Sequence, residues 1–339
     1  MSTLTSNGQG TSAARPVVAG IQPARTAAAV LFGIAVSVTL VSALADPGHS
    51  TTGVMLMALL LIRTGTDVAA LGTIGAVVLV LCRPRRVRAE AGTDLPRIDL
   101  MGSAAAWAGA WTVLLATALA IELLVPSVVV AHGAIGPDIA DVVARTRWLV
   151  VGLVIAGLAR VLASAARSER DGALVLGVAM LGLVPATVTG HGNVSTEGWT
   201  ATIGLLLHVA AVSVWVGGLL ALLVHARSLW SQGVAVETVR RFSRVALVCY
   251  AGVAASGVVT VLAQTDLEQL LASRAHGAIL AAKVALLLVV GAAGAAQRYV
   301  VLPRLSARGP VVFLVVAASE LVLLGTALGL AVTLTHTAS

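Results

Sequence analysis

The sequence is poor in charged residues, aromatic residues and cysteine, and each shortage excludes a class of protein. Charged residues make up 11% of the 339 residues, whereas a typical soluble domain carries about 25%. Aromatic residues, at 3%, are too few to build a stacking surface for nucleic acid. The two cysteines, Cys82 and Cys249, form no ligand motif and are expected to be small buried apolar residues rather than a disulfide.

Hydrophobic residues make up 58% of the chain, and the mean hydropathy is +0.98. So many apolar residues cannot all be buried in one core, and a lipid bilayer is the solvent in which the remainder can be exposed. A helix needs about 20 apolar residues to cross a bilayer. The sequence therefore predicts an all-α, polytopic transmembrane helical bundle of about nine spans. The candidate spans are roughly 27–45, 54–82, 101–124, 147–166, 172–190, 201–224, 243–264, 277–297 and 311–335.

The basic residues predict how this bundle is oriented. They are twenty-one arginines and one lysine. With nine alternating spans, most arginines collect on one face, and the positive-inside rule makes that face cytoplasmic. The N-terminus is then cytoplasmic and the C-terminus lies outside. The seventeen arginines of the inner face are Arg15, Arg25, Arg83, Arg85, Arg86, Arg88, Arg97, Arg160, Arg167, Arg170, Arg227, Arg240, Arg241, Arg244, Arg298, Arg304 and Arg308, and the three of the outer face are Arg145, Arg147 and Arg274.

The chain divides into three parts. Residues 1–26 are polar and are expected to form a disordered cytoplasmic tail. Residues 27–170 form an N-terminal half of four spans, and residues 171–339 form a second half of five. The first apolar stretch is too long for a signal peptide and is expected to stay as an anchor. We expect a lipid-embedded, multi-pass protein of the cytoplasmic (inner) membrane, with the oligomeric state left open.

The histidines are unevenly shared between the two faces of this predicted bundle. His225 is cytoplasmic, and the other six lie on or near the outer face: His49, His132, His191, His208, His276 and His336. Imidazole binds transition metals near neutral pH, and thioether sulfur suits Cu(I). The candidate metal ligands are His49, Met55, Met57, His191 and His208. The ordinary alternatives are solvated loop histidines and methionines that pack in lipid or core.

His208 is the candidate that lies deepest. It is placed roughly 10 Å below the outer end of its span, where an ionisable side chain is costly and usually functional. Trp215 follows seven residues later on the same helical face, and Gly217 and Gly218 permit close helix approach. The alternative for His208 is a neutral histidine that hydrogen-bonds between helices.

Lys283 and Glu320 are two further charges inside predicted spans. A single buried charge costs several kcal/mol, so the sequence predicts that they pair between adjacent helices. Such a pair either fixes the helix register or lies beside an ion path.

Ordered segments across the second half resemble the copper resistance protein D family of bacterial inner-membrane copper transport proteins. The segment from His208 to Gly218 is the most specific of them. The segments are PATVTGHG (185–192), HVAAVSVWVGG (208–218), RFSRVAL (241–247), HGAILAAKVALLL (276–288) and SELVLLGTALGLAVTLT (319–335). The first 180 residues are similar to the N-terminal half of longer members, in a less specific way.

The resemblance implies movement of copper ions across the cytoplasmic membrane, often regarded as uptake, and it places His191, His208 and Trp215 in the functional set. It also implies a separate extracytoplasmic copper-binding protein as donor. The sequence has no nucleotide-binding loop, so we expect no nucleotide hydrolysis. From the resemblance we expect a transporter and not an enzyme. Two alternatives stay open at this stage: a haem-binding electron-transfer subunit, and a factor that delivers copper for oxidase assembly.

Overall fold

The computed structural model describes residues 53–84, 100–131, 139–190, 199–264, 274–305 and 310–337. Within these ranges the chain is helical and contains no strand, so the expected all-α fold is confirmed. The predicted tail at 1–26, the predicted span at 27–45, and His49, His132 and His191 lie outside the described residues.

Long apolar helices account for nearly all of the described chain. Five of them contain a stretch long and apolar enough to cross a membrane: 61–82, 100–124, 145–165, 203–231 and 235–259, with a shorter apolar stretch at 311–324. The protein is therefore a multi-pass helical membrane protein. The helices are α2 (Gly53–Cys82), α4 (Leu100–Ala131), α5 (Ile139–Ala165), α6 (Glu169–Leu181), α7 (Leu183–Gly190), α8 (Trp199–Ser231), α9 (Ala235–Gln264), α11 (Arg274–Ala296), the π-helical η1 (Gln297–Val301), the 3-10 helix η2 (Leu302–Arg304) and α13 (Pro310–Thr337).

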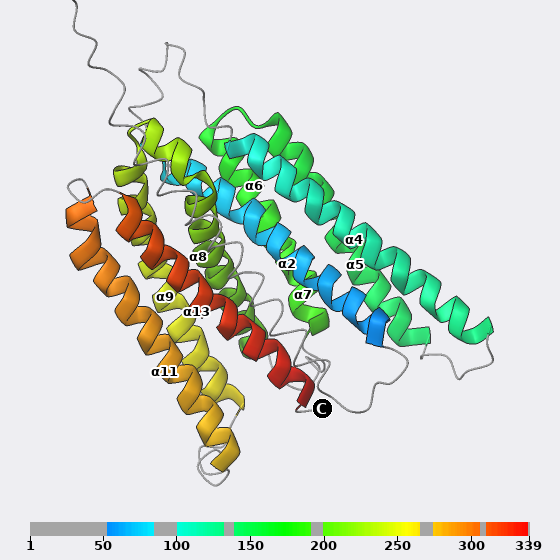
Figure 1. Ribbon diagram of the computed structural model, residues 1–339. Coiled ribbons are helices and arrows are strands. Elements are labelled where there is room, and N and C mark those ends of the chain that lie inside the picture. The colour runs from blue at the N-terminus through cyan, green and yellow to red at the C-terminus, as the bar shows by residue number, and fades with distance from the viewer. Residues whose placement is uncertain are drawn as a thin grey trace, which may run out of the picture.

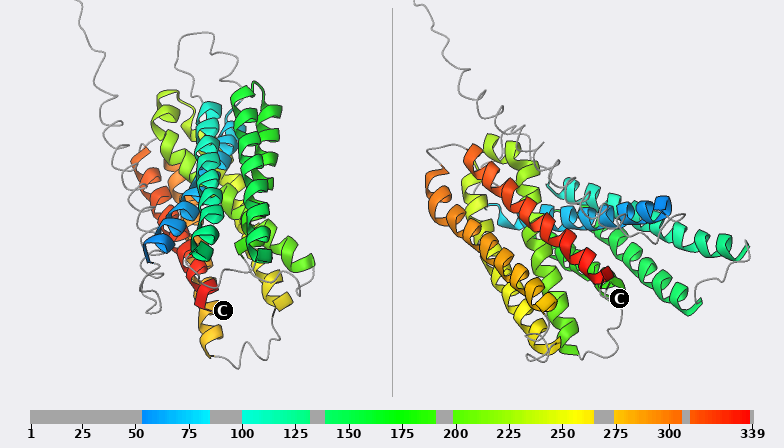
Figure 2. Two further views of the ribbon diagram at one scale, coloured as in Figure 1. Left: turned by 90° about the vertical axis from the view of Figure 1, so that its right-hand side faces the viewer. Right: turned by 60° about the horizontal axis from the view of Figure 1, so that its bottom comes forward.

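The helices form two groups that meet at α2 and α8. Helices α4 to α7 lie on one side of α2, while α9 and α13 pack on α8 and α11 packs on α13 at the edge of the bundle (Figures 1 and 2). The apolar stretch of α2 is 78% buried, whereas that of α4 is 17% buried and that of α9 is 17% buried. Helix α2 is thus a central element, and the outer helices turn most of their apolar surface towards lipid.

Glycines bring α2 and α8 into backbone contact. A Cβ atom on Gly75 would overlap the carbonyl group of Gly217, and one on Gly217 would overlap the carbonyl oxygen of Leu71. A Cβ atom on Gly218 would overlap the ring of Phe242 on α9. The close approach expected at Gly217 and Gly218 is confirmed, and it joins the two helix groups.

The predicted span at 172–190 is two helices, which differs from the expectation of one. Helix α6 ends at Leu181, and α7 starts after Gly182. Pro185 explains the break, because its ring would clash with the carbonyl group four residues earlier in a continuous helix. Pro185 is instead tolerated in the first turn of α7. A Cβ atom on Gly182 would also overlap the ring of Trp111.

Helix α6 starts at a capping box. Ser168 Oγ accepts a hydrogen bond from the backbone N–H of Asp171 (3.2 Å). In return, Asp171 Oδ2 accepts from the backbone N–H groups of Arg167 (2.8 Å) and Ser168 (2.7 Å). These backbone bonds hold the pKa of Asp171 below its usual value of 3.8. The capping box therefore starts α6 only three residues after the end of α5, and this short connection makes α5 and α6 neighbours.

Helices α8 and α9 extend further than their apolar runs predict. Helix α8 continues to Ser231, and α9 starts at Ala235, eight residues before the predicted span. Gly233, with φ +69°, makes the tight turn between them. The charged residues on either side of this turn are therefore helical.

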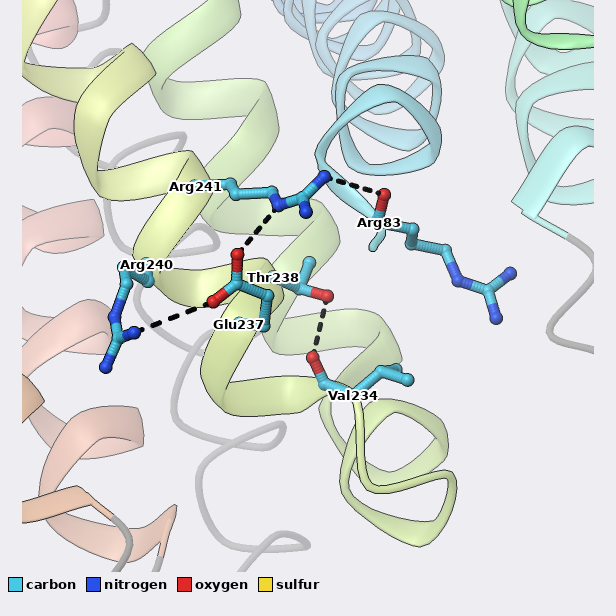
Figure 3. Close-up of polar contacts among 6 residues, drawn as sticks. All are labelled: Arg83, Val234, Glu237, Thr238, Arg240 and Arg241. Carbon is cyan, nitrogen blue, oxygen red and sulfur yellow. Dashed lines mark hydrogen bonds and ion pairs between the residues drawn. The ribbon is translucent and has the colours of Figure 1, made fainter. Parts of the chain in front are cut away.

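Several arginines tie the end of α2 to the start of α9 (Figure 3). Arg241 Nε donates to Glu237 Oε1 (2.9 Å), and Arg241 Nη1 donates to the carbonyl oxygen of Arg83 (3.3 Å). Arg83 Nη2 donates to Gln232 Oε1 (3.1 Å). Arg240 adds an ion pair with Glu237 (3.7 Å). These arginines belong to the set that the sequence assigns to the cytoplasmic face, and the structure brings them to one end of the bundle.

Candidate functional site

His208 lies on α8 and bonds to α9. Its Nδ1 atom is 3.0 Å from Ser256 Oγ, and that hydroxyl can also donate to the carbonyl oxygen of Val253 (3.0 Å). Which of Nδ1 and Ser256 Oγ donates the proton depends on the tautomer of the imidazole ring. A hydrogen bond at the second ring nitrogen is how proteins orient a metal-binding histidine. The bond to Ser256 thus holds the His208 ring in one orientation between α8 and α9.

Trp215 faces the same neighbouring helix. It is buried, and its ring meets that of Tyr250 on α9 edge to face, with centroids 5.8 Å apart and planes at 87°. The seven-residue spacing of His208 and Trp215 predicted one shared helical face, and their contacts with α9 confirm it. Trp215 lies about 10 Å further along α8 than His208, at 1.5 Å per residue.

A cavity of about 330 Å³ opens below Trp215, between α8, α9, α11, η1 and α13. Most of its wall is apolar or aromatic, and a few polar side chains interrupt it. A Cβ atom on Gly291 would overlap the phenol of Tyr250, so glycine at this position leaves room for that ring. The aromatic wall residues are Trp215, Phe242, Tyr250 and Phe313, and the polar ones used below are Gln297, Arg298 and Glu320.

Glu320 is the buried acid of this cavity, at 2% exposure. The Gln297 carboxamide, with its nitrogen turned to Glu320, donates to Oε1 (2.8 Å) and Oε2 (3.1 Å). The sequence predicted Lys283 as the partner of Glu320, and the side chain of Lys283 lies outside the described part of the chain. Among the described side chains, Gln297 is the polar partner of Glu320.

Helix register explains why Gln297 takes this place. Helices α11 and α13 contact each other across a short connection. Residues at similar distances from that connection lie near each other, and Gln297 is eight residues before Leu305 while Glu320 is ten residues after Pro310. This arithmetic was available in the sequence, but the expectation of opposite charges favoured Lys283.

The remaining predicted ligands are only partly placed. Met55 and Met57 lie in the first turns of α2, and their side chains lie outside the described part of the chain, as do His49 and His191. In Figure 1 the starts of α2 and α8 lie towards the same end of the bundle, and His208 is in the third turn of α8. Among the described residues, no group of three or more His, Cys, Asp or Glu side chains is arranged to hold a metal ion.

His225 is at the other end of α8 and has a different neighbour. Its Nε2 atom is 3.1 Å from Ser103 Oγ on α4. His208 and His225 are seventeen residues apart, about 25 Å along the helix. These two histidines therefore cannot bind one haem together, which weakens the electron-transfer alternative for this helix.

The fold and site define a multi-pass helical membrane protein with a cavity between its C-terminal helices. Residues 236–334 match the family model of Copper resistance protein D, so the resemblance to that family is confirmed over these residues. The match covers α9, α11 and α13 and starts after His208 and Trp215. No curated protein and no solved structure matches the chain. The match implies a role in copper resistance or copper transport for this membrane protein.

Proposed function

We propose that the protein carries copper ions across the cytoplasmic membrane in the direction of uptake. The observation that carries this proposal is the His208–Ser256 bond, which orients an imidazole inside a bundle whose C-terminal helices match the model of the copper resistance protein D family. Copper is the cargo of this route and not a resident cofactor.

Capture of copper is assigned to the extracytoplasmic mouth. His49, His191, Met55 and Met57 supply imidazole and thioether ligands there, and a separate extracytoplasmic copper-binding protein delivers the ion. His208 then receives it below the surface. Transport requires that each site binds the ion tightly enough for it to enter the bundle and weakly enough for it to pass to the next site.

The path beyond His208 follows the face of α8 that packs on α9. It leads past the Trp215–Tyr250 ring contact into the cavity that Glu320 and Gln297 line. From there it reaches the arginine-rich end of the bundle, which the positive-inside rule makes cytoplasmic. In this proposal the chain acts as a transporter without an enzymatic step, and the ion gradient or a partner drives the movement.

Reconstituted proteoliposomes test the proposal. We expect vesicles that contain the wild-type protein to accumulate radioactive copper added outside, well above protein-free vesicles prepared in parallel. An absorbance spectrum of the same preparation distinguishes copper transport from the haem-binding alternative, since bound haem gives a Soret band. Vesicles that stay free of copper, or a protein that purifies with haem, would overturn the transport proposal.

A further inference from the structure

The cavity contains an acid that has no cationic partner among the described side chains. Glu320 is almost fully buried, and its polar neighbour is the neutral Gln297 carboxamide. Arg298 also lines the cavity, but its Nη1 atom donates to the carbonyl oxygen of Ser243 (3.4 Å), and no ion pair among the described residues joins it to Glu320. A carboxylate buried in this way must be neutralised by a proton or by a bound cation.

Gln297 can hold Glu320 in either of these two states. With its nitrogen towards the acid, the carboxamide donates to both oxygens of an ionised carboxylate. Turned by half a rotation, it presents its carbonyl oxygen to the hydroxyl of a protonated acid. One neutral neighbour therefore satisfies both forms, whereas a lysine or arginine would favour the ionised form alone.

The cavity walls also suit a cation. Trp215, Tyr250, Phe242 and Phe313 surround the space, and the faces of aromatic rings attract positive charge. The volume of about 330 Å³ exceeds the roughly 30 Å³ that one water occupies in the liquid, so an ion fits with several waters. The titratable or charged side chains that face this space, besides Glu320, are Tyr250, Arg298 and Tyr299.

We propose that Glu320 is a site at which a copper ion and a proton exchange, so that each copper ion passing through the cavity displaces one proton. This inference rests on the proposed copper transport and adds that the movement of copper is coupled to the movement of protons in the opposite direction. When copper arrives, the O–H bond of the acid breaks, the carboxylate oxygens contact the ion and the proton passes to water. No electrons are transferred, and for Cu(I) the exchange leaves the net charge of the site unchanged.

Simultaneous measurement of copper and protons in proteoliposomes tests this exchange. Vesicles are loaded with a pH-sensitive dye, the membrane potential is clamped with potassium and valinomycin, and Cu(I) kept reduced with ascorbate is added outside. We expect the lumen of wild-type vesicles to become more alkaline as copper enters, with about one proton leaving per Cu(I), because one carboxyl carries the exchange.

Three variants assign the exchange to Glu320. Glu320→Gln should abolish the proton signal and lower copper uptake about tenfold or more, whereas Glu320→Asp, which keeps the carboxyl, should retain coupling at a lower rate. Glu122→Gln is the matched control, since Glu122 is a more exposed acid paired with Arg145 (3.1 Å) outside this cavity. It should behave as wild type in both measurements.

The outcomes separate this inference from the function on which it rests. Copper uptake by wild type without alkalinisation of the lumen overturns the exchange and leaves transport standing, and so does a Glu320→Gln variant with wild-type stoichiometry. No copper uptake by wild type overturns the proposed function itself. If Glu320→Gln does not assemble into monodisperse protein, the wild-type stoichiometry and the Glu320→Asp variant decide the question.

Discussion

Replacement of His208 by alanine is expected to lower copper uptake into proteoliposomes by roughly 10- to 100-fold, the range found when a metal site loses a supporting group. In the proposed route the imidazole receives the ion below the surface, because its bond to Ser256 holds the ring between α8 and α9. The same variant should bind less copper at equilibrium in detergent. The protein should still fold, since His208 is only half-buried.

Two further variants make this result specific. His225→Ala removes a histidine of the same helix that bonds Ser103 at the other end of the bundle, and it should leave uptake close to wild type. Ser256→Ala keeps the imidazole but removes its hydrogen-bond partner, so uptake should fall to a level between those of wild type and His208→Ala. Equal uptake in wild type and His208→Ala would remove His208 from the route.

Gly217→Ala is expected to prevent correct assembly of the bundle. The added Cβ atom would overlap the backbone of α2 at Leu71 and Gly75, and a backbone cannot turn away as a flexible side chain does. Overpacked cores usually lose about 1–3 kcal/mol, and this contact should lie at or above that range. The measurements are the yield of monodisperse protein in detergent and the midpoint of its thermal unfolding.

Gly177→Ala is the control for this substitution. Gly177 is also helical, and a Cβ atom there would meet nothing within 4 Å. The same change should therefore leave the protein unaltered or stabilise it by up to about 1 kcal/mol, the difference in helix propensity. Similar unfolding midpoints for the two variants would show that α2 and α8 do not meet at Gly217.

The sequence predicted most of the helices because each of them contains a long apolar run. The described helices fall on eight of the expected spans, and the glycines of α8 lie at the helix contact that their small size indicated. The break at Pro185 and the long polar ends of α8 and α9 were not predicted. Hydropathy identifies the residues that can lie in lipid, but it does not predict how far a helix continues beyond the membrane into water.

The candidate site could be predicted only where its residues share one helix. The seven-residue spacing of His208 and Trp215 fixed their common face without knowledge of any partner. The cavity instead combines residues of α8, α9, α11 and α13, so its existence depends on helix register and packing. The Gln297–Glu320 contact was therefore missed, because charge complementarity suggested Lys283 while register selects Gln297.

Access to position 208 from the two sides of the membrane tests the central claim, that copper enters the bundle from the extracytoplasmic mouth by way of His208. The measurement uses His208→Cys in a chain whose two native cysteines, both buried, are replaced by alanine. A membrane-impermeant thiol reagent should modify this cysteine from the extracytoplasmic side, and copper added on that side should protect it. Modification from the cytoplasmic side alone, or no protection by copper, would contradict the account.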